Sequence, residues 1–300
     1  MPQPKAQNKG RILYDDGIVV MRRVRQAAPV DSIVVTFPGY DQTDITLPGF
    51  GETLLHGAGY DLICVQKRSN NGYQSMSREA FDKAVKPTLS RYRRICFYGT
   101  SVGAYAALYF GRGQRADILS LSPRNSLHPI YAEVLGRRGP QGTPFTHEPL
   151  EAGESRAKRV TVVYDPVPRT DRLEHADLRL LRECVEPAFP QLTHVSLRHT
   201  GHPVATALAE VHLLRPAVLN FMRGHAFNVT PFRRMKGRSP YYMLNLSRWL
   251  EKHGRWRQAE AVVDRGLRLF PASGFLKAQK ERLAQERAAR EAIGAAGAAP

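Results

Sequence analysis

The segment Gly99-Thr100-Ser101-Val102-Gly103 follows the pattern G-x-S-x-G. In this pattern a serine lies at a sharp turn between a strand and a helix, and the two glycines avoid clashes where the backbone comes close to itself. The flanking sequence fits, because the apolar run RICFY precedes the turn and AYAALYF follows it. A helix that begins beside Ser101 also favours negative charge there. We therefore predict that Ser101 is a nucleophile and that Gly99 and Gly103 shape its turn.

A serine hydroxyl needs a base within hydrogen-bonding distance, and the base needs a carboxylate that orients it. The chain has ten histidines. His202, in the segment HTGHP, follows the last expected strand (194–199) and precedes the last expected helix of the first 225 residues. His199 is the nearest rival, but it belongs to the end of the strand. We predict that His202 is the base.

Two carboxylates compete for the third position. Asp165 closes the expected strand 159–165, and Asp171 lies six residues further on. Asp165 could instead form a turn before Pro166, and Asp171 could instead cap the following helix. A place on the loop beyond the strand favours Asp171 slightly, and both residues stay candidates.

An oxyanion hole needs backbone N–H groups that point at the developing negative charge. Val102, directly after the candidate nucleophile, is expected to supply one of them. The turn FPGYDQ (37–42) follows the expected strand 32–37, and its glycine lets the backbone approach closely. We choose the N–H of Tyr40 as the second donor, with Asp41 as the alternative.

Short β-branched runs alternate with helical patterns along the first 225 residues. The sequence predicts an opening hairpin around Asp15-Asp16-Gly17. The expected strands are 32–37, 60–66, 94–99, 117–122, 159–165 and 194–199, and the expected helices are 77–90, 102–110, 173–184 and 203–222. This alternation predicts an α/β fold with a mostly parallel sheet and helices on both faces.

The remaining segments differ in texture. Residues 123–158 are rich in Pro, Gly and Arg and form a candidate lid, in which Arg124, Arg137 and Arg138 could meet an acidic substrate. Residues 226–292 are expected to be helical, and 241–271 resembles one tetratricopeptide repeat. Such a unit must pack on the preceding domain or on a partner, because it cannot bury its apolar face alone. Residues 1–10 and 293–300 are expected to be disordered tails.

Residues 11–225 resemble the α/β-hydrolase family. The nucleophile elbow at Ser101, the Pro-Gly turn after the third strand, the acid after the seventh strand and Gly-His after the eighth occur in the family's order. The resemblance implies a Ser-His-Asp triad of Ser101, His202 and either Asp171 or Asp165. It implies oxyanion donors at Tyr40 and Val102. The sequence departs from many members in its Pro-Gly-Tyr turn and in an acid loop without Gly-x-x-Asp.

Composition limits the remaining possibilities. The formal net charge of +17 would attract an anionic surface, but no nucleic-acid-binding module accompanies it, so no specific nucleic acid is expected. No convincing metal-ligand spacing or phosphate-binding loop occurs, so we expect neither a metal nor a cofactor. Three cysteines, no signal peptide and no long apolar run predict a cytoplasmic protein.

The sequence therefore predicts a serine esterase or acyl hydrolase that acts on a carboxylic ester or thioester. Its substrate would be a small-molecule, lipid or glycan acyl ester. One alternative is an acyltransferase that uses a glycan or another alcohol as acceptor. An alternative of a different class is a non-catalytic scaffold that binds a protein through 241–292, or a polyanion through the basic surface.

Overall fold

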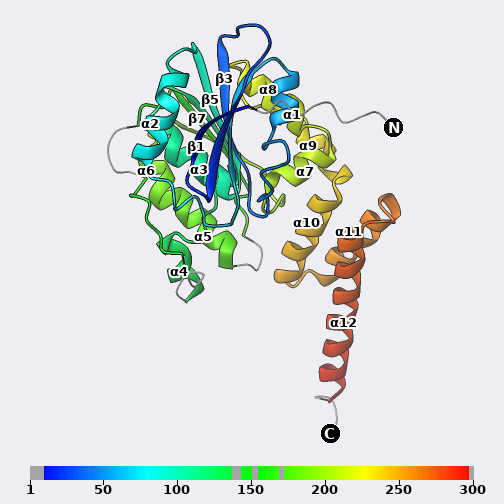
Figure 1. Ribbon diagram of the computed structural model, residues 1–300. Coiled ribbons are helices and arrows are strands. Elements are labelled where there is room, and N and C mark those ends of the chain that lie inside the picture. Colours follow the sequence, from blue (N-terminus) through cyan, green and yellow to red (C-terminus); the bar gives the residue numbers. More distant parts are fainter. Residues whose placement is uncertain (1–9, 137–142, 151–154, 169–171, 297–300) are drawn as a thin grey trace.

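A single sheet runs through the centre of the protein (Figure 1). The computed structural model describes residues 10–136, 143–150, 155–168 and 172–296. Within these ranges the sheet has eight strands in the order β1-β2-β4-β3-β5-β6-β7-β8. The strands are β1 (Arg11–Asp15), β2 (Val19–Val24), β3 (Ser32–Phe37), β4 (Asp61–Lys67), β5 (Arg94–Thr100), β6 (Asp117–Leu121), β7 (Arg159–Tyr164) and β8 (Leu192–Ser196).

Only the first strands of the sheet are antiparallel. Strand β2 pairs antiparallel with both β1 and β4, which confirms the opening hairpin, and every later pairing is parallel. The carboxyl ends of the parallel strands therefore meet along one edge of the sheet, where α/β proteins build their sites. The α/β-hydrolase-like fold class predicted from the sequence is confirmed.

Helices cover both faces of the sheet, as the alternation predicted. One apolar cluster joins the sheet to α2 (Arg78–Leu89), α3 (Val102–Gly111) and α5 (Arg172–Leu180). A second cluster joins the opposite face to α1 (Glu52–Gly57), α7 (Val204–Glu210), α8 (Leu214–Met222), α9 (Phe232–Met235) and α10 (Pro240–Lys252). The described residues also form four short helical segments: α4 (Pro129–Leu135), the π-helical turn Leu181–Val185, α6 (Glu186–Ala188) and the 3-10 turn Lys236–Arg238.

The strands are buried because their side chains supply both clusters in turn. Along β3, Ile33 and Val35 face the first cluster and Val34 faces the second. Phe37, at the end of the same strand, stacks on Phe110 of α3 with ring centroids 5.9 Å apart. Apolar side chains on both faces are typical of a central parallel strand, which helices cover on both sides.

One helix differs from its prediction. The helical pattern at 203–222 forms two helices, α7 and α8, instead of one. The backbone turns between them at His212, whose φ is 58°, and the N–H of Leu213 bonds to the carbonyl of Leu208. Periodicity alone did not reveal this break, since apolar residues continue on both sides of it.

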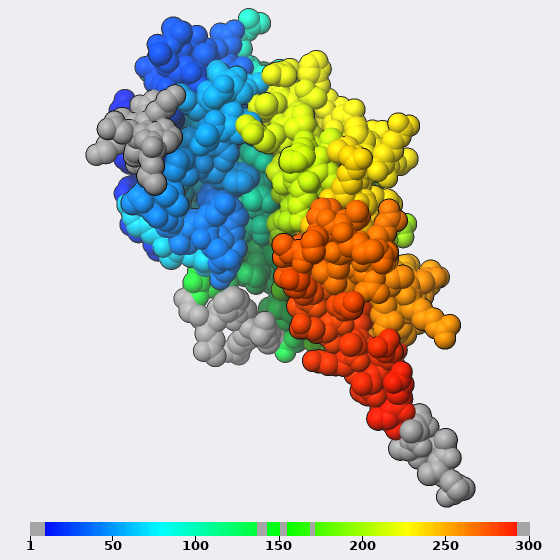
Figure 2. Space-filling model, turned by 90° about the vertical axis from the view of Figure 1, so that its right-hand side faces the viewer, coloured from blue at the N-terminus to red at the C-terminus, as the bar shows by residue number. Residues whose placement is uncertain are grey.

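Three helices end the chain: α10, α11 (Trp256–Leu269) and α12 (Gly274–Ala296). Figure 2 shows them, orange to red, against the yellow-green segment that holds α7 and α8. Met243 of α10 and Leu276 of α12 belong to the same buried cluster as Val204 of α7. The helical extension therefore packs on the sheet-containing part of the chain, and its likeness to a tetratricopeptide repeat stays a prediction.

Other predicted segments are described only in part. The candidate lid, 123–158, contains α4, and residues 137–142 and 151–154 lie outside the described ranges. Of the two predicted disordered tails, residues 1–9 and 297–300 lie outside the described ranges. Residues 293–296 belong to the last turn of α12, so their predicted disorder is wrong. Among the helices of the described residues, none combines the length and apolar character needed to cross a membrane.

Candidate active site

Ser101 lies at the turn between β5 and α3. Its backbone has φ 56° and ψ −122°, a positive-φ conformation that residues other than glycine rarely adopt. The N–H of Ser101 donates to the carbonyl of Leu121, and its own carbonyl accepts from the N–H of Arg124. Strained conformations held in this way concentrate at functional sites.

Glycine is required on both sides of this turn. A Cβ atom at Gly99 would lie 2.1 Å from the carbonyl oxygen of Gly103. A Cβ atom at Gly103 would lie 2.2 Å from the carbonyl oxygen of Phe37, at the end of the neighbouring strand. The atoms that each Cβ would meet belong to the backbone, which cannot move aside as a flexible side chain can. The turn therefore lies directly against the end of β3.

The imidazole of His202 lies beside the hydroxyl of Ser101. Its Nε2 atom is 2.8 Å from the Ser101 Oγ, a hydrogen-bonding distance. The two residues are far apart in the sequence and meet because β5 and the loop after β8 end at the same edge of the sheet. At this distance a proton can pass between a hydroxyl and an imidazole.

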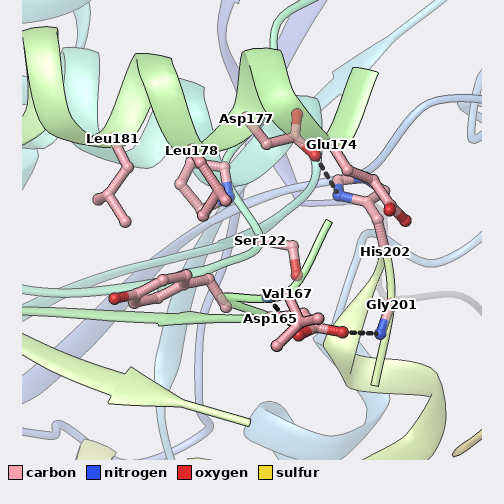
Figure 3. A pocket seen from close by; sticks show the side chains of 11 residues that line it. Ser122, Asp165, Val167, Glu174, Asp177, Leu178, Leu181, Gly201 and His202 are labelled. Carbon is pink, nitrogen blue, oxygen red and sulfur yellow. Dashed lines mark hydrogen bonds and ion pairs between the residues drawn. The ribbon is translucent and has the colours of Figure 1, made fainter. Parts of the chain in front are cut away.

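The other ring nitrogen of His202 faces Asp177. The Oδ2 atom of Asp177 lies 3.5 Å from Nδ1 of His202 (Figure 3). Arg124 donates from Nε to Oδ1 and from Nη2 to Oδ2 of this carboxylate, and Tyr131 donates its hydroxyl to Oδ1 at 2.6 Å. Asp177 is thus held in place by two side chains while it faces the imidazole.

The two acids predicted from the sequence are placed differently. Asp165 accepts hydrogen bonds from the backbone N–H groups of Val167, His199 and Gly201, at 2.9, 3.1 and 2.7 Å. Figure 3 shows its carboxylate beside Gly201, whereas Asp177 points at the imidazole. Asp165 therefore shapes the loop that carries His202. Asp171 lies outside the described residues.

Asp165, Asp177 and His202 line a cavity of about 30 Å³. Burial raises the pKa of Asp177, and the hydrogen bonds and charge of Arg124 partly offset that rise. Burial also raises the pKa of Asp165, against the effect of its backbone donors. Glu174, one turn before Asp177 on α5, pushes both pKa values further up through its charge. Arg124 is therefore the main group that favours an ionised Asp177.

The candidate oxyanion turn is anchored by two side chains from other segments. The hydroxyl of Tyr73 donates to the carbonyl of Pro38 at 2.9 Å. The ammonium of Lys67, at the end of β4, donates to the carbonyl of Tyr40 at 3.4 Å and to Oδ1 of Asn70 at 2.7 Å. Lys67 has no exposed surface, and burial lowers its pKa to about 8, although the charge of Asp41 acts in the opposite direction.

The predicted residues meet at one pocket of about 530 Å³. Ser101, Val102, His202 and Tyr40 all line it. Val102 is the first residue of α3, so its N–H has no acceptor within the helix. The pocket brings together the predicted nucleophile, base and both predicted oxyanion donors.

Sequence reasoning missed Asp177, Arg124 as its partner, and the buried Lys67. One signal for Asp177 was present, because Glu174 and Asp177 are spaced i, i+3 on the helix 172–180 beside the buried positions Ala176 and Leu180. Two acids next to the apolar face of a helix indicate a functional or structural role, since burial of carboxylates is costly. In the described ranges, no group of three or more His, Cys, Asp or Glu side chains is arranged to hold a metal ion.

Comparisons with known proteins show a similarity of backbone structure only. No protein-family model matches this chain, and no curated protein matches it. Among solved structures, the chain is similar to the Pyrococcus furiosus esterase Pf2001, with 15% identity over 72% of this chain and 89% of that one, and a TM-score of 0.44. It is also similar to Est1E from Butyrivibrio proteoclasticus (15% identity, 72% and 98% covered, TM-score 0.43). A third is the carboxylesterase CesB (YbfK) from Bacillus subtilis (11% identity, 72% and 92% covered, TM-score 0.46). Likeness at this level assigns no activity, so the chemistry of the site rests on its own geometry.

Proposed function

We propose that this protein is a serine hydrolase that cleaves a carboxylic ester or thioester through an acyl-enzyme. One observation carries the proposal: Oγ of Ser101, at a strained strand-to-helix turn, lies 2.8 Å from Nε2 of His202. A hydroxyl held next to an imidazole in this way can be deprotonated as it attacks a carbonyl.

The reaction follows from these positions. Nε2 of His202 takes the proton as Oγ of Ser101 bonds to the acyl carbon, and the N–H groups of Val102 and Tyr40 stabilise the oxyanion. The bond to the leaving group then breaks, and His202 gives its proton to the departing oxygen or sulfur. Water, activated by the same imidazole, hydrolyses the acyl-enzyme and restores Ser101.

We assign the third position of the triad to Asp177 rather than to Asp165 or Asp171. Asp177 faces Nδ1 of His202, whereas the carboxylate of Asp165 is engaged with backbone N–H groups. The distance of 3.5 Å is longer than a good hydrogen bond, and such bonds often shorten when substrate binds. A carboxylate at this place selects the tautomer that leaves Nε2 free to accept a proton and stabilises the imidazolium.

The pocket fits the ester of a small or medium-sized molecule, or the acyl end of a lipid or glycan ester. Its volume of about 530 Å³ is within the range of small-molecule sites. The walls combine Asn70, Asn125 and Ser126 with Leu127 and Leu173. Such a mixed lining suits an acyl chain that carries or adjoins polar groups.

The test is covalent labelling of the protein with a fluorophosphonate, together with hydrolysis of p-nitrophenyl acetate. Ser101→Ala is expected to abolish labelling, and His202→Ala to slow it by about 10³-fold or more. Ser126→Ala is the matched control, because Ser126 lines the same pocket without the contact to His202. A folded wild type that does not label, or labelling that survives Ser101→Ala, contradicts the proposal.

A further inference from the structure

The helical extension reaches the loop that carries His202. The hydroxyl of Tyr241, in the first turn of α10, donates to the backbone carbonyl of His202 at 2.6 Å. Figure 1 shows α10 beside α7, the helix that begins directly after this loop. The bond joins two segments 39 residues apart in sequence, and it ends on the residue proposed to be the base.

The start of α10 is itself fixed to α7. Ser239 caps α10, since its hydroxyl accepts from the N–H of Tyr242. The carboxylate of Glu210, at the end of α7, accepts from the hydroxyl of Ser239 and from the N–H of Tyr241 at 3.0 Å. The backbone of Tyr241 is therefore fixed independently of the loop, so its hydroxyl can hold the carbonyl of His202 in place.

A second contact from α10 meets the other end of the loop. The ring of Trp249 lies 5.0 Å from the ring of His199, centroid to centroid. The carboxylate of Asp165 accepts from the N–H groups of His199 and Gly201. Both Asp165 and α10 therefore contact the loop 199–203.

The other C-terminal helices support α10. Arg282 and Gln279 of α12 bond to the carboxylate of Glu251 on α10. The ring of Phe275, at the start of α12, meets the ring of Tyr241 edge to face at 6.3 Å. The extension is therefore packed around the side chain that touches the His202 loop.

We propose that the C-terminal helices form part of the catalytic unit and that Tyr241 is a positioning residue, which holds the backbone of His202 so that its imidazole reaches both Ser101 and Asp177. This inference rests on the proposed serine-hydrolase function. Without α10, residues 11–225 would keep the turn at Ser101 but would lose the contacts that α10 makes with the loop carrying His202.

The test compares Tyr241→Phe with wild type in the full-length protein. The change removes one hydroxyl and keeps the ring that packs on Phe275. We expect labelling by the fluorophosphonate to slow by about 5-fold, which corresponds to about 1 kcal/mol, the typical contribution of one hydrogen bond. The final extent of labelling is expected to equal that of wild type, because the fold and the nucleophile are intact. With p-nitrophenyl acetate, kcat is expected to fall while KM changes by less than about twofold, since both acylation and deacylation use His202.

Tyr14→Phe is the matched control, because the hydroxyl of Tyr14 bonds to Asp16 in the β1–β2 hairpin, away from the site. It is expected to label at the wild-type rate. If wild type labels and Tyr241→Phe labels as fast as Tyr14→Phe, the positioning role is overturned while the proposed function stands. A lower final extent of labelling in Tyr241→Phe, at an unchanged rate, would show loss of folded protein and also overturns the role. If wild type itself does not label, the proposed function fails first.

Discussion

Oδ2 of Asp177 lies 3.5 Å from Nδ1 of His202, and it reaches this position from within helix α5 instead of from the loop after β7. A carboxylate on a helix has less freedom than one on a loop, and Arg124 restricts it further through two hydrogen bonds. The same arginine favours the ionised form that an orienting acid needs. The site therefore depends on how α5 lies across the strand ends.

Exchange of Asp177 for Asn separates the effect of the carboxylate on His202 from its effect on the stability of the fold. The amide keeps the shape of the side chain but cannot stabilise an imidazolium, and it favours the wrong tautomer of His202. We expect Asp177→Asn to slow fluorophosphonate labelling by about 10²- to 10⁴-fold. The thermal unfolding midpoint reports separately on the loss of the ion pair with Arg124.

Asp165→Asn is the matched comparison for this change. It weakens the acceptor for the N–H groups of Val167, His199 and Gly201, and we expect a loss of about 1–3 kcal/mol in the free energy of unfolding. Labelling at 25 °C is expected to fall much less than in Asp177→Asn. The opposite order of the two labelling rates would assign the triad acid to Asp165.

Gly103 should tolerate no side chain. A Cβ atom there would lie 2.2 Å from the carbonyl oxygen of Phe37, and relief requires β3 and α3 to move apart. We expect Gly103→Ala to lower the free energy of unfolding by about 3 kcal/mol or more, and to abolish labelling. Gly57→Ala is the control, because a Cβ atom at Gly57 would have no neighbour within 4 Å. Urea unfolding of the two variants makes the comparison, and equal midpoints would contradict it.

The parts of the site that sequence could predict are those set by local backbone geometry. Five consecutive residues specify the turn at Ser101. The position of His202, between the end of a strand and the start of a helix, could likewise be predicted from the local sequence. The choice of acid is different, because it depends on the tilt of α5 and on a pairing between Arg124 and Asp177 that no spacing predicts. The contact between Tyr241 and His202 is likewise set by how α10 packs on α7.

The fold shows the same division. Strands of the parallel sheet were predictable because burial on both faces leaves continuous apolar runs, and their order brought Ser101 and His202 to one edge. The break at His212 was not predictable, since it is a change in backbone direction within an apolar pattern. The helices at 241–292 were predicted, but not their contact with the loop 199–203.

We predict that Lys67 sets an upper pH limit on the labelling rate, because burial lowers its pKa to about 8. As the pH rises through about 8, the ammonium loses its proton, and its hold on the carbonyl of Tyr40 and on Asn70 weakens. The oxyanion turn is then less well held, so we expect the labelling rate to fall above about pH 8. In Lys67→Met the rate is expected to be lower at pH 7 and to lack this alkaline decline. A decline of the same size in wild type and Lys67→Met would assign it to another group.

We expect Lys67 also to affect the free energy of unfolding, but there its contribution should rise with pH, whereas the labelling rate falls. Its pKa is about 8 in the folded protein and has an ordinary value of 10.5, so between these two values the unfolded chain binds more protons than the folded one. The contribution of Lys67 to the free energy of unfolding therefore rises with pH across this window, because burial disfavours only the charged form. Below about pH 8 both states are protonated, and the contribution is constant and unfavourable relative to an uncharged side chain.

Urea unfolding of wild type and Lys67→Met at pH 7 and pH 9.5 measures the effect: the difference in stability should move in favour of wild type at the higher pH. Other titrating groups cancel in this difference, so a value that does not change with pH would mean that Lys67 keeps its proton, and the alkaline decline in labelling would then need another cause.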